Sequence, residues 1–137
     1  MASQGVVGGG AVNTESRQLR TQVSYRFGVP LLYLSGELDR HSHDDLRALI
    51  EQELASRPSG LLLECSELAF IDSGGLSLLF ETLKSLEDRR WLGIVSPNVG
   101  VLKLIEMTGL TDRPGVRVYS DLAAVKKALS GSGAQPS

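Results

Sequence analysis

The sequence predicts an α/β domain with a mixed, mostly parallel sheet of about five strands, an antiparallel first strand and about four helices. Three observations support this. Short apolar runs alternate with segments of helical periodicity, in the order β-β-α-β-α-β-α-β-α. The first two runs flank Gly28-Val29-Pro30, a turn sequence, and so predict a hairpin. The later runs are continuously apolar, which is typical of strands covered on both faces.

The first half of the chain begins with two strands and a helix. Alternation of apolar and polar residues predicts a strand over residues 23–27, and a more apolar strand follows over 31–34. The first helix is predicted to be capped by Ser42, with Asp45 as its capping-box partner, and to end before Pro58. Its apolar face consists of four residues at helical spacing: Leu46, Leu49, Ile50 and Leu54.

The middle of the chain alternates strands with a second helix. Residues 61–63 predict a buried strand, residues 73–87 a helix, and residues 92–95 another buried strand. The apolar stripe predicted for this helix is Leu76, Leu79, Phe80, Leu83 and Leu86.

The last part of the chain adds two helices and one strand. A helix is predicted over 97–107, with Ser96 as its cap and a proline at its first position. Gly109 is placed to stop this helix in a left-handed conformation. A short strand over 116–119 and a terminal helix over 121–129 complete the expected order.

Length and composition limit the classes of protein that the chain can represent. Small-residue segments at 1–19 and 131–137 predict disordered tails around one domain at 20–130. The net charge of -2 and the scattered basic residues argue against nucleic acid binding. The single cysteine, Cys65, follows an apolar run and is expected to be buried and inert. With no signal peptide and no membrane-spanning run, we expect a cytoplasmic protein.

The most informative segment is the predicted junction between the strand ending at Ile71 and the following helix. If Asp72 caps this helix, Ile71 and Leu76 stand at the two positions of a hydrophobic staple. A cap at Ser73 would create no such pair. A cap at Asp72 is therefore favoured. It places Ser73 at the first helical position, where its hydroxyl is not used to cap the helix.

The first turn of the same helix is unusually bare. Gly74 and Gly75 are expected to leave its N–H groups open to a partner or an anion. Leu78 falls outside the predicted apolar stripe, so we expect it to be at least half exposed and to form a docking edge beside Ser73. The simpler interpretation is that Ser73 serves only in local capping.

Several motifs of the chain resemble those of STAS domains. Residues 71–76, Ile-Asp-Ser-Gly-Gly-Leu, resemble the family signature D-S-x-G-L, and residues 36–39, Gly-Glu-Leu-Asp, are similar to the G-E-[IL]-D element that ends the second strand. Ser96-Pro97 and residues 104–110 resemble the segment around the third helix. The similarity covers roughly residues 22–129. The best-known single-domain members are bacterial anti-sigma factor antagonists.

This resemblance implies a regulatory function. In that family the serine matching Ser73 is phosphorylated by a partner that is both a serine kinase and an anti-sigma factor. The unmodified antagonist binds this partner and frees the sigma factor, and a phosphatase resets the phosphorylated form. Asp39 and Asp72 match positions beside the acceptor, where Asp39 takes part in kinase contact. The partner-binding residues expected here are Asp39, Asp72, Ser73, Gly74, Gly75 and Leu78.

Other functions fit the sequence less well. Ile71 replaces the first glycine of a nucleophile elbow, and both histidines precede Ser73, opposite to the order of that catalytic triad. His41 and His43 lack further histidine or exposed cysteine ligands, so solvated polar residues are expected there rather than a metal site. The chain lacks a phosphate-binding P-loop, so ATP is expected to belong to a kinase partner. We expect no cofactor, and a binding module rather than an enzyme.

A second regulatory function remains open. STAS domains also serve as scaffolds or regulatory subunits in transporter assemblies and stress-signalling complexes. In such a complex Ser73 would be a docking residue without phosphorylation.

Overall fold

The computed structural model describes residues 18–86 and 90–133, with side chains described up to Ser130. The expected tails at 1–19 and 131–137 lie mostly outside these ranges. In chain order the elements are β1 (Arg20–Arg26), β2 (Val29–Leu38), α1 (His43–Leu54), β3 (Gly60–Ile71), α2 (Ser73–Leu86), β4 (Trp91–Val95), α3 (Val99–Met107), the short 3-10 helix η2 (Leu110–Asp112), β5 (Val116–Tyr119) and α4 (Leu122–Gly133).

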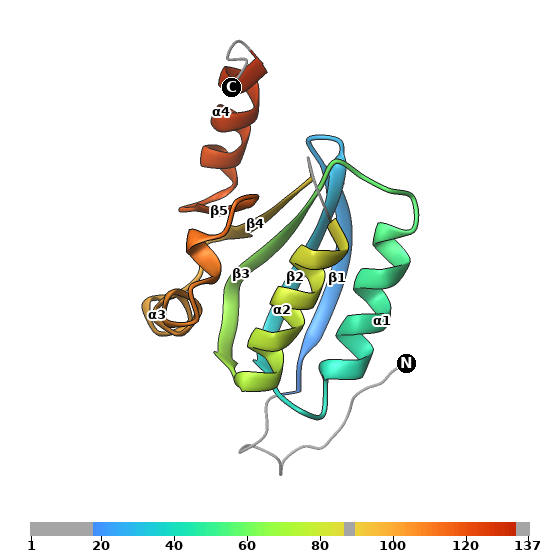
Figure 1. Cartoon of the computed structure of the whole chain (residues 1–137), viewed down its shortest axis with the longest axis vertical. Coiled ribbons are helices and arrows are strands. Elements are labelled where there is room, and N and C mark those ends of the chain that lie inside the picture. The colour runs from blue at the N-terminus through green and yellow to red at the C-terminus, as the bar shows by residue number, and fades with distance from the viewer. Residues whose placement is uncertain (1–17, 87–89, 134–137) are drawn as a thin grey trace.

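The strands form one five-stranded sheet in the order β1-β2-β3-β4-β5 (Figure 1). β1 and β2 pair antiparallel through the turn after Arg26, and the other neighbouring strands pair parallel. The predicted fold class, including its antiparallel first strand, is therefore confirmed.

The sheet has a different covering on each face. α1, α2 and α3 contribute Ile50, Leu78 and Ile105 to the larger core cluster, so these three helices cover one face. α4 contributes Val125 to a second cluster, which includes Trp91, on the opposite face. α1 and α2 lie side by side over the sheet (Figure 1). Both faces of β3 are buried along Gly60–Cys65, as its continuous apolar run predicts.

Two strands are longer than predicted, and their length positions the candidate site. β2 continues past residue 34 to Leu38, and β3 continues past residue 63 to Ile71. Register shifts between Tyr33 and Ser35 and at Gly36 accompany this extension of the β2–β3 ladder. Polar residues interrupt the apolar runs at these points, which is why the apolar pattern alone underestimates the strands.

The start of α3 corrects the prediction that Ser96 caps it. Asn98 is the cap, and its side-chain oxygen accepts from the Val101 N–H at 2.8 Å. The Asn98 amide also donates to the Leu68 carbonyl at 3.0 Å. Ser96 instead adopts a left-handed conformation with φ 58° and donates to the Ser120 carbonyl at 2.9 Å. Asn98 is the cap because its side chain can accept from the start of α3 and also donate to β3.

The start of α1 is placed as predicted, but its capping is different. Ser42 occupies the cap position and makes no side-chain cap hydrogen bond, so the expected capping box with Asp45 is wrong. The Ser42 hydroxyl is used in the preceding turn. It accepts from the Asp39 N–H at 3.1 Å and donates to the Asp39 carbonyl at 3.1 Å.

The orientation of α2 corrects the expected exposure of Leu78. Leu78 is 1% exposed and belongs to the core, as do Leu79 and Leu86. Leu76 and Phe80 are only partly buried. The apolar arc of α2 is wide because the helix packs against both the sheet and α1, and the predicted stripe covers only one side of it.

Two other expectations concern the core and the last helix. Cys65 is buried as expected, and burial raises the pKa of its thiol to about 12. α4 ends at Gly133 rather than near residue 129. Its final Ser-Gly-Ser-Gly run has low helix propensity, which is why the sequence predicts an earlier end.

Candidate functional site

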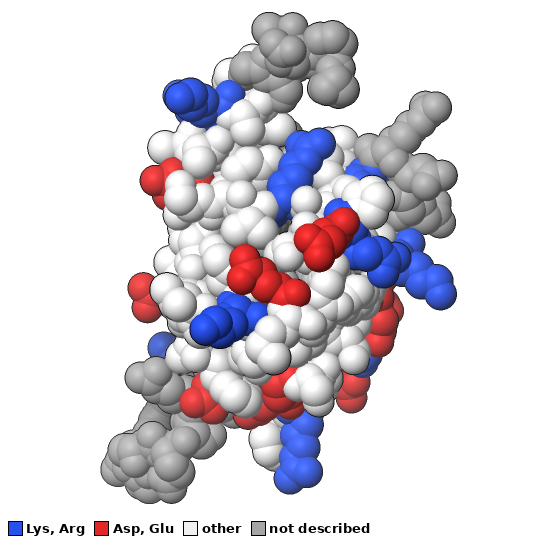
Figure 2. Space-filling model, turned by 60° about the vertical axis from the view of Figure 1, so that its left-hand side comes forward, with Lys and Arg blue, Asp and Glu red and all other residues white. Residues whose placement is uncertain are grey.

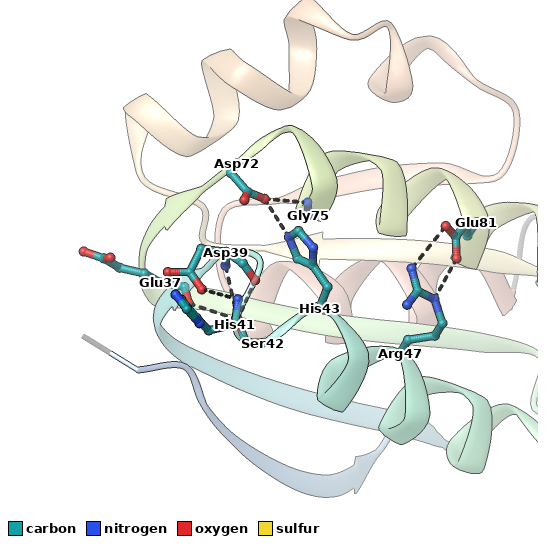
Figure 3. Close-up of polar contacts among 9 residues, drawn as sticks. All are labelled: Glu37, Asp39, His41, Ser42, His43, Arg47, Asp72, Gly75 and Glu81. Atoms are coloured by element: carbon teal, nitrogen blue, oxygen red, sulfur yellow. Dashed lines mark hydrogen bonds and ion pairs between the residues drawn. The ribbon is translucent and has the colours of Figure 1, made fainter. Parts of the chain in front are cut away.

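The candidate site lies where β2 and β3 end and α1 and α2 begin. Leu38 pairs with Ile71 at the end of the parallel ladder, and the Asp72 N–H donates to the Leu38 carbonyl at 3.1 Å. This register brings Asp39 and Asp72 to neighbouring positions at one edge of the sheet (Figure 3). Partner and ligand sites commonly occupy this edge in parallel sheets.

Asp72 caps α2, as the sequence predicts. Its Oδ1 accepts from the Gly75 N–H at 2.7 Å, and its carbonyl accepts from the Leu76 N–H at 2.9 Å. Ser73 is therefore the first residue of α2. Its side chain is exposed, and its hydroxyl makes no hydrogen bond to any residue that the structure describes. The proposed acceptor oxygen is therefore available to solvent.

An imidazole that the sequence did not assign to this site also contacts Asp72. His43, the first residue of α1, places Nε2 2.7 Å from Asp72 Oδ1 (Figure 3). The side chains are 18% and 29% exposed. Burial alone would raise the pKa of Asp72, but hydrogen bonds from the Gly75 N–H and from His43 outweigh it and lower that pKa below its ordinary value.

The two glycines of α2 are packed rather than open. A Cβ at Gly74 would lie 2.1 Å from His43 Cε1, and a Cβ at Gly75 would lie 2.8 Å from Ile71 Cγ1. Gly75 is buried, and its N–H is already bonded to Asp72. The expectation that both glycines leave the first turn clear for a partner is therefore wrong. They allow His43 and the core to approach the backbone closely.

A hydrogen-bonded turn holds Asp39 after β2. Its carbonyl accepts from the N–H groups of Ser42 and His43 at 2.9 and 3.1 Å, and its Oδ1 accepts from the His41 N–H at 2.9 Å. Asp39 is half-buried, whereas His41 is exposed. The turn thus fixes the direction of the chain between β2 and the His43 position.

Charge around the site is predominantly negative. Arg47 forms ion pairs with Asp44 at 2.8 Å and with Glu81 of α2 at 3.0 Å. The second of these is drawn in Figure 3. Acidic side chains gather along the lower edge of the face in Figure 2, from which a basic side chain also projects. This edge is the end of the molecule where α2 begins in Figure 1. An added phosphate here would meet an edge that is already acidic.

The structure brings together only part of the predicted partner-binding set. Asp39, Asp72 and Ser73 meet at the edge, whereas Leu78 is in the core. The sequence analysis missed His43 and also Phe70, which is 44% exposed three residues before Ser73. A usable signal for His43 was that it begins α1 at the same sheet edge where α2 begins, and that the second residue of α2 is Gly74, which has no side chain.

Within residues 18–86 and 90–133, no group of three or more metal-binding side chains comes together. His41 is exposed as expected, but half-buried His43 is not the solvated residue that the sequence suggested. Over the same described ranges, no helix has the length and apolar character that crossing a bilayer requires.

The fold and the site define the class of protein. The STAS domain family model matches residues 20–125, and the chain belongs to this family. A curated relative, the anti-sigma F factor antagonist of Paenibacillus polymyxa, is 29% identical over 94 residues, covering 67% of this chain and 80% of the relative.

Solved structures show the same architecture. An anti-sigma factor antagonist from Mycobacterium paratuberculosis has a TM-score of 0.71 and 28% identity, over 83% of this chain and 93% of that one. The Bacillus cell fate determinant SpoIIAA in its phosphorylated form has a TM-score of 0.61 and 22% identity, over 80% of this chain and 99% of that one.

Proposed function

We propose that this chain is an anti-sigma factor antagonist that acts in the cytoplasm and is switched by phosphorylation at Ser73. In its unmodified form it binds a serine-kinase anti-sigma factor and so releases a sigma factor. One observation carries the proposal: Ser73 is exposed with its hydroxyl unbonded among the described residues, because Asp72 supplies the cap of α2. The antagonists among its relatives support the same role.

The position of Ser73 determines how a phosphate would act. The first helical residue lies at the positive end of the α2 dipole, where an anion stabilises a helix by about 0.3–1 kcal/mol. A phosphate of about −1.5 to −2 charges should therefore strengthen α2 rather than melt it. The switch consequently works at the interface, through the bulk of the phosphate and its repulsion by acidic groups.

The acidic edge supplies part of that repulsion. Asp39 and Asp72 flank the acceptor, and Asp72 is already ionised well below neutral pH. In the complex, acidic groups of the partner that face Ser73 would be repelled by the added phosphate, which the unmodified form lacks. A phosphatase that removes the phosphate restores the binding-competent edge.

Phe70 takes over the apolar docking role that was assigned to Leu78. It lies at the carboxyl end of β3 opposite Glu37, and it is 44% exposed. Aromatic residues at the centre of an interface often contribute much of the binding free energy. Because side chains alternate along a strand and Ile71 faces the core under α2, Phe70 points to the other face of the sheet, at the same end as Ser73. We therefore propose Phe70 as an apolar contact at the margin of the partner surface that carries Asp39 and Ser73.

The acceptor is tested with candidate anti-sigma serine kinases from the same organism, each mixed with the protein and ATP. Intact mass should show one added phosphate on the wild-type protein and on Ser77→Ala, an exposed serine of the same helix. Ser73→Ala should take up none. A phosphate that persists in Ser73→Ala would refute the acceptor assignment.

The switch is tested by measuring partner binding. Ser73→Ala should bind the kinase about as tightly as the wild-type protein, and Ser73→Glu should lose binding. Unchanged binding by both the phosphorylated protein and Ser73→Glu would favour a scaffold without a phosphorylation switch.

Hydrogen exchange separates interface repulsion from helix melting. Protection of α2 should be kept or increased after phosphorylation. Broad loss of protection across residues 73–86 would mean that the switch unfolds the helix instead.

A further inference from the structure

His43 joins the first turns of two helices through a single carboxylate oxygen. Its Nε2 lies 2.7 Å from Asp72 Oδ1, and the same oxygen accepts from the Gly75 N–H at 2.7 Å. The imidazole comes from α1, whereas Asp72 and Gly75 belong to the start of α2 (Figure 3). Any displacement of this ring therefore acts on the oxygen that caps α2.

Gly74 provides the space in which the ring lies. For a Cβ built at this position, the three nearest atoms all belong to His43: Cε1 at 2.1 Å, Nδ1 at 2.8 Å and Nε2 at 2.9 Å. The conflict is with the far end of a side chain, so a methyl group here would push the ring away from Asp72. The need for glycine at this position thus arises from His43, whereas at Gly75 it arises from the core residues Ile71 and Leu38.

Ser73 lies between the two residues that the ring contacts. Asp72 precedes it and bonds to the imidazole, and Gly74 follows it and is covered by the ring. Because the Ser73 hydroxyl makes no bond among the described residues, its position depends on the backbone on either side. His43 fixes that backbone on both sides.

From this geometry we infer that His43 is a positioning residue of the switch site, acting on Ser73 through Asp72, with Gly74 as its matched partner. The functional part of this inference rests on the proposed phosphorylation of Ser73. The structural part, a matched pair formed by His43 and Gly74, does not.

Amide hydrogen exchange tests the structural part without any partner. In His43→Ala, Asp72 Oδ1 loses the bond to the imidazole, which is one of the two hydrogen bonds that hold it in the capping position. The Gly75 and Leu76 amides should therefore exchange about five- to tenfold faster. His43→Gln, whose amide can donate to Asp72, should restore most of the protection. His41→Ala is the matched control, because its exposed side chain lies two residues away. Equal exchange in all four proteins would overturn the inference.

A double-mutant cycle tests the pair itself. Gly74→Ala should displace the ring and speed exchange at Gly75 to about the same extent as His43→Ala. The double variant should be no worse than either single variant, because the same bond can be lost only once, and alanine is the better helix former. Additive losses in the double variant would show that residues 43 and 74 are independent.

The functional part uses the kinase that phosphorylates the wild-type protein. The rate of Ser73 phosphorylation at saturating ATP should fall about fivefold or more in His43→Ala and in Gly74→Ala, and recover in His43→Gln. If the wild-type protein is phosphorylated and His43→Ala reacts at the same rate, the positioning role is wrong while the proposed function stands. If no kinase phosphorylates the wild-type protein, the proposed switch is wrong. The hydrogen-exchange rates and the double-mutant cycle would then still show whether His43 and Gly74 act as a pair.

Discussion

Asp72 makes two contacts through a single side-chain oxygen. Its Oδ1 caps α2 and also accepts from His43, so the start of one helix is joined to the start of another. The cap was predictable, because Ile71 and Leu76 favour this register. The His43 contact was not, because it joins residues 29 positions apart through a chain path that only the folded sheet defines.

The lowered pKa of Asp72 predicts a specific dependence of stability on pH. A carboxylate whose folded pKa lies below its ordinary value of 3.8 stabilises the fold fully above that value, and this contribution is lost as the pH falls through the folded pKa. Asp72→Asn retains a capping oxygen but removes the charge. The difference in unfolding free energy between wild type and Asp72→Asn should therefore shrink as the pH falls below about 4.

This difference is measured by urea unfolding at a series of pH values. Asp45→Asn, an exposed acidic residue in the first turn of α1, is the control. A difference for Asp72→Asn that stays constant down to the lowest pH would show that the charge of Asp72 makes no contribution.

At the scale of elements, the sequence located helices more reliably than it oriented them. α2 was predicted over 73–87 and is observed as Ser73–Leu86, yet the predicted stripe left Leu78 outside and the structure buries it. Helical periodicity marks which residues are apolar, but the packing of α1 and the sheet decides which part of a wide apolar arc faces inward. The predicted capping box at Ser42 and the predicted cap at Ser96 are wrong for a similar reason, because both hydroxyls bond elsewhere in the fold, although Ser42 does occupy the cap position of α1.

The burial of Leu78 predicts a large loss of stability on truncation. Leu78→Ala should lower the unfolding free energy by about 2–5 kcal/mol, because it leaves a cavity between α2 and the core. Leu104→Ala, the same change at a residue that is 37% exposed, should cost less than about 1 kcal/mol. Similar small losses in both variants, measured by denaturant unfolding, would contradict the observed orientation of α2.

The double role of Asn98 predicts a graded loss at α3. Asn98→Ala should cost about 2 kcal/mol, because both the cap on Val101 and the bond to the Leu68 carbonyl are lost. Asn98→Ser retains a capping oxygen and should cost about half as much. Thermal unfolding of the two variants checks the order, and equal losses would show that the cap makes no contribution.

At the scale of the whole molecule, fold class and strand directions followed from the order of apolar runs, as confirmed by the sheet. The sequence also located the edge that carries Asp39, Asp72 and Ser73, because carboxyl ends of parallel strands meet there. It could not give the composition of the surrounding surface, since exposure of Phe70 and burial of Leu78 depend on how the helices cover the sheet.

The exposed position of Phe70 predicts an effect on binding without a large effect on stability. Phe70→Ala should weaken binding of the anti-sigma partner about tenfold or more, as truncation of an interface aromatic commonly does. Its unfolding free energy should change by less than about 1 kcal/mol. Val118→Ala, 41% exposed on β5, is the control for both measurements. Unchanged affinity in Phe70→Ala would place the partner surface elsewhere.

The order of the strands in the sheet is also their order in the chain. During synthesis, each new strand therefore meets a neighbour that has already left the ribosome, and no position in the sheet must be held open for a later segment. The edge bearing Ser73 is built from β2, β3 and the first turns of α1 and α2, all of which precede β4. The elements of the switch site are thus translated before the C-terminal part that completes the core beneath it.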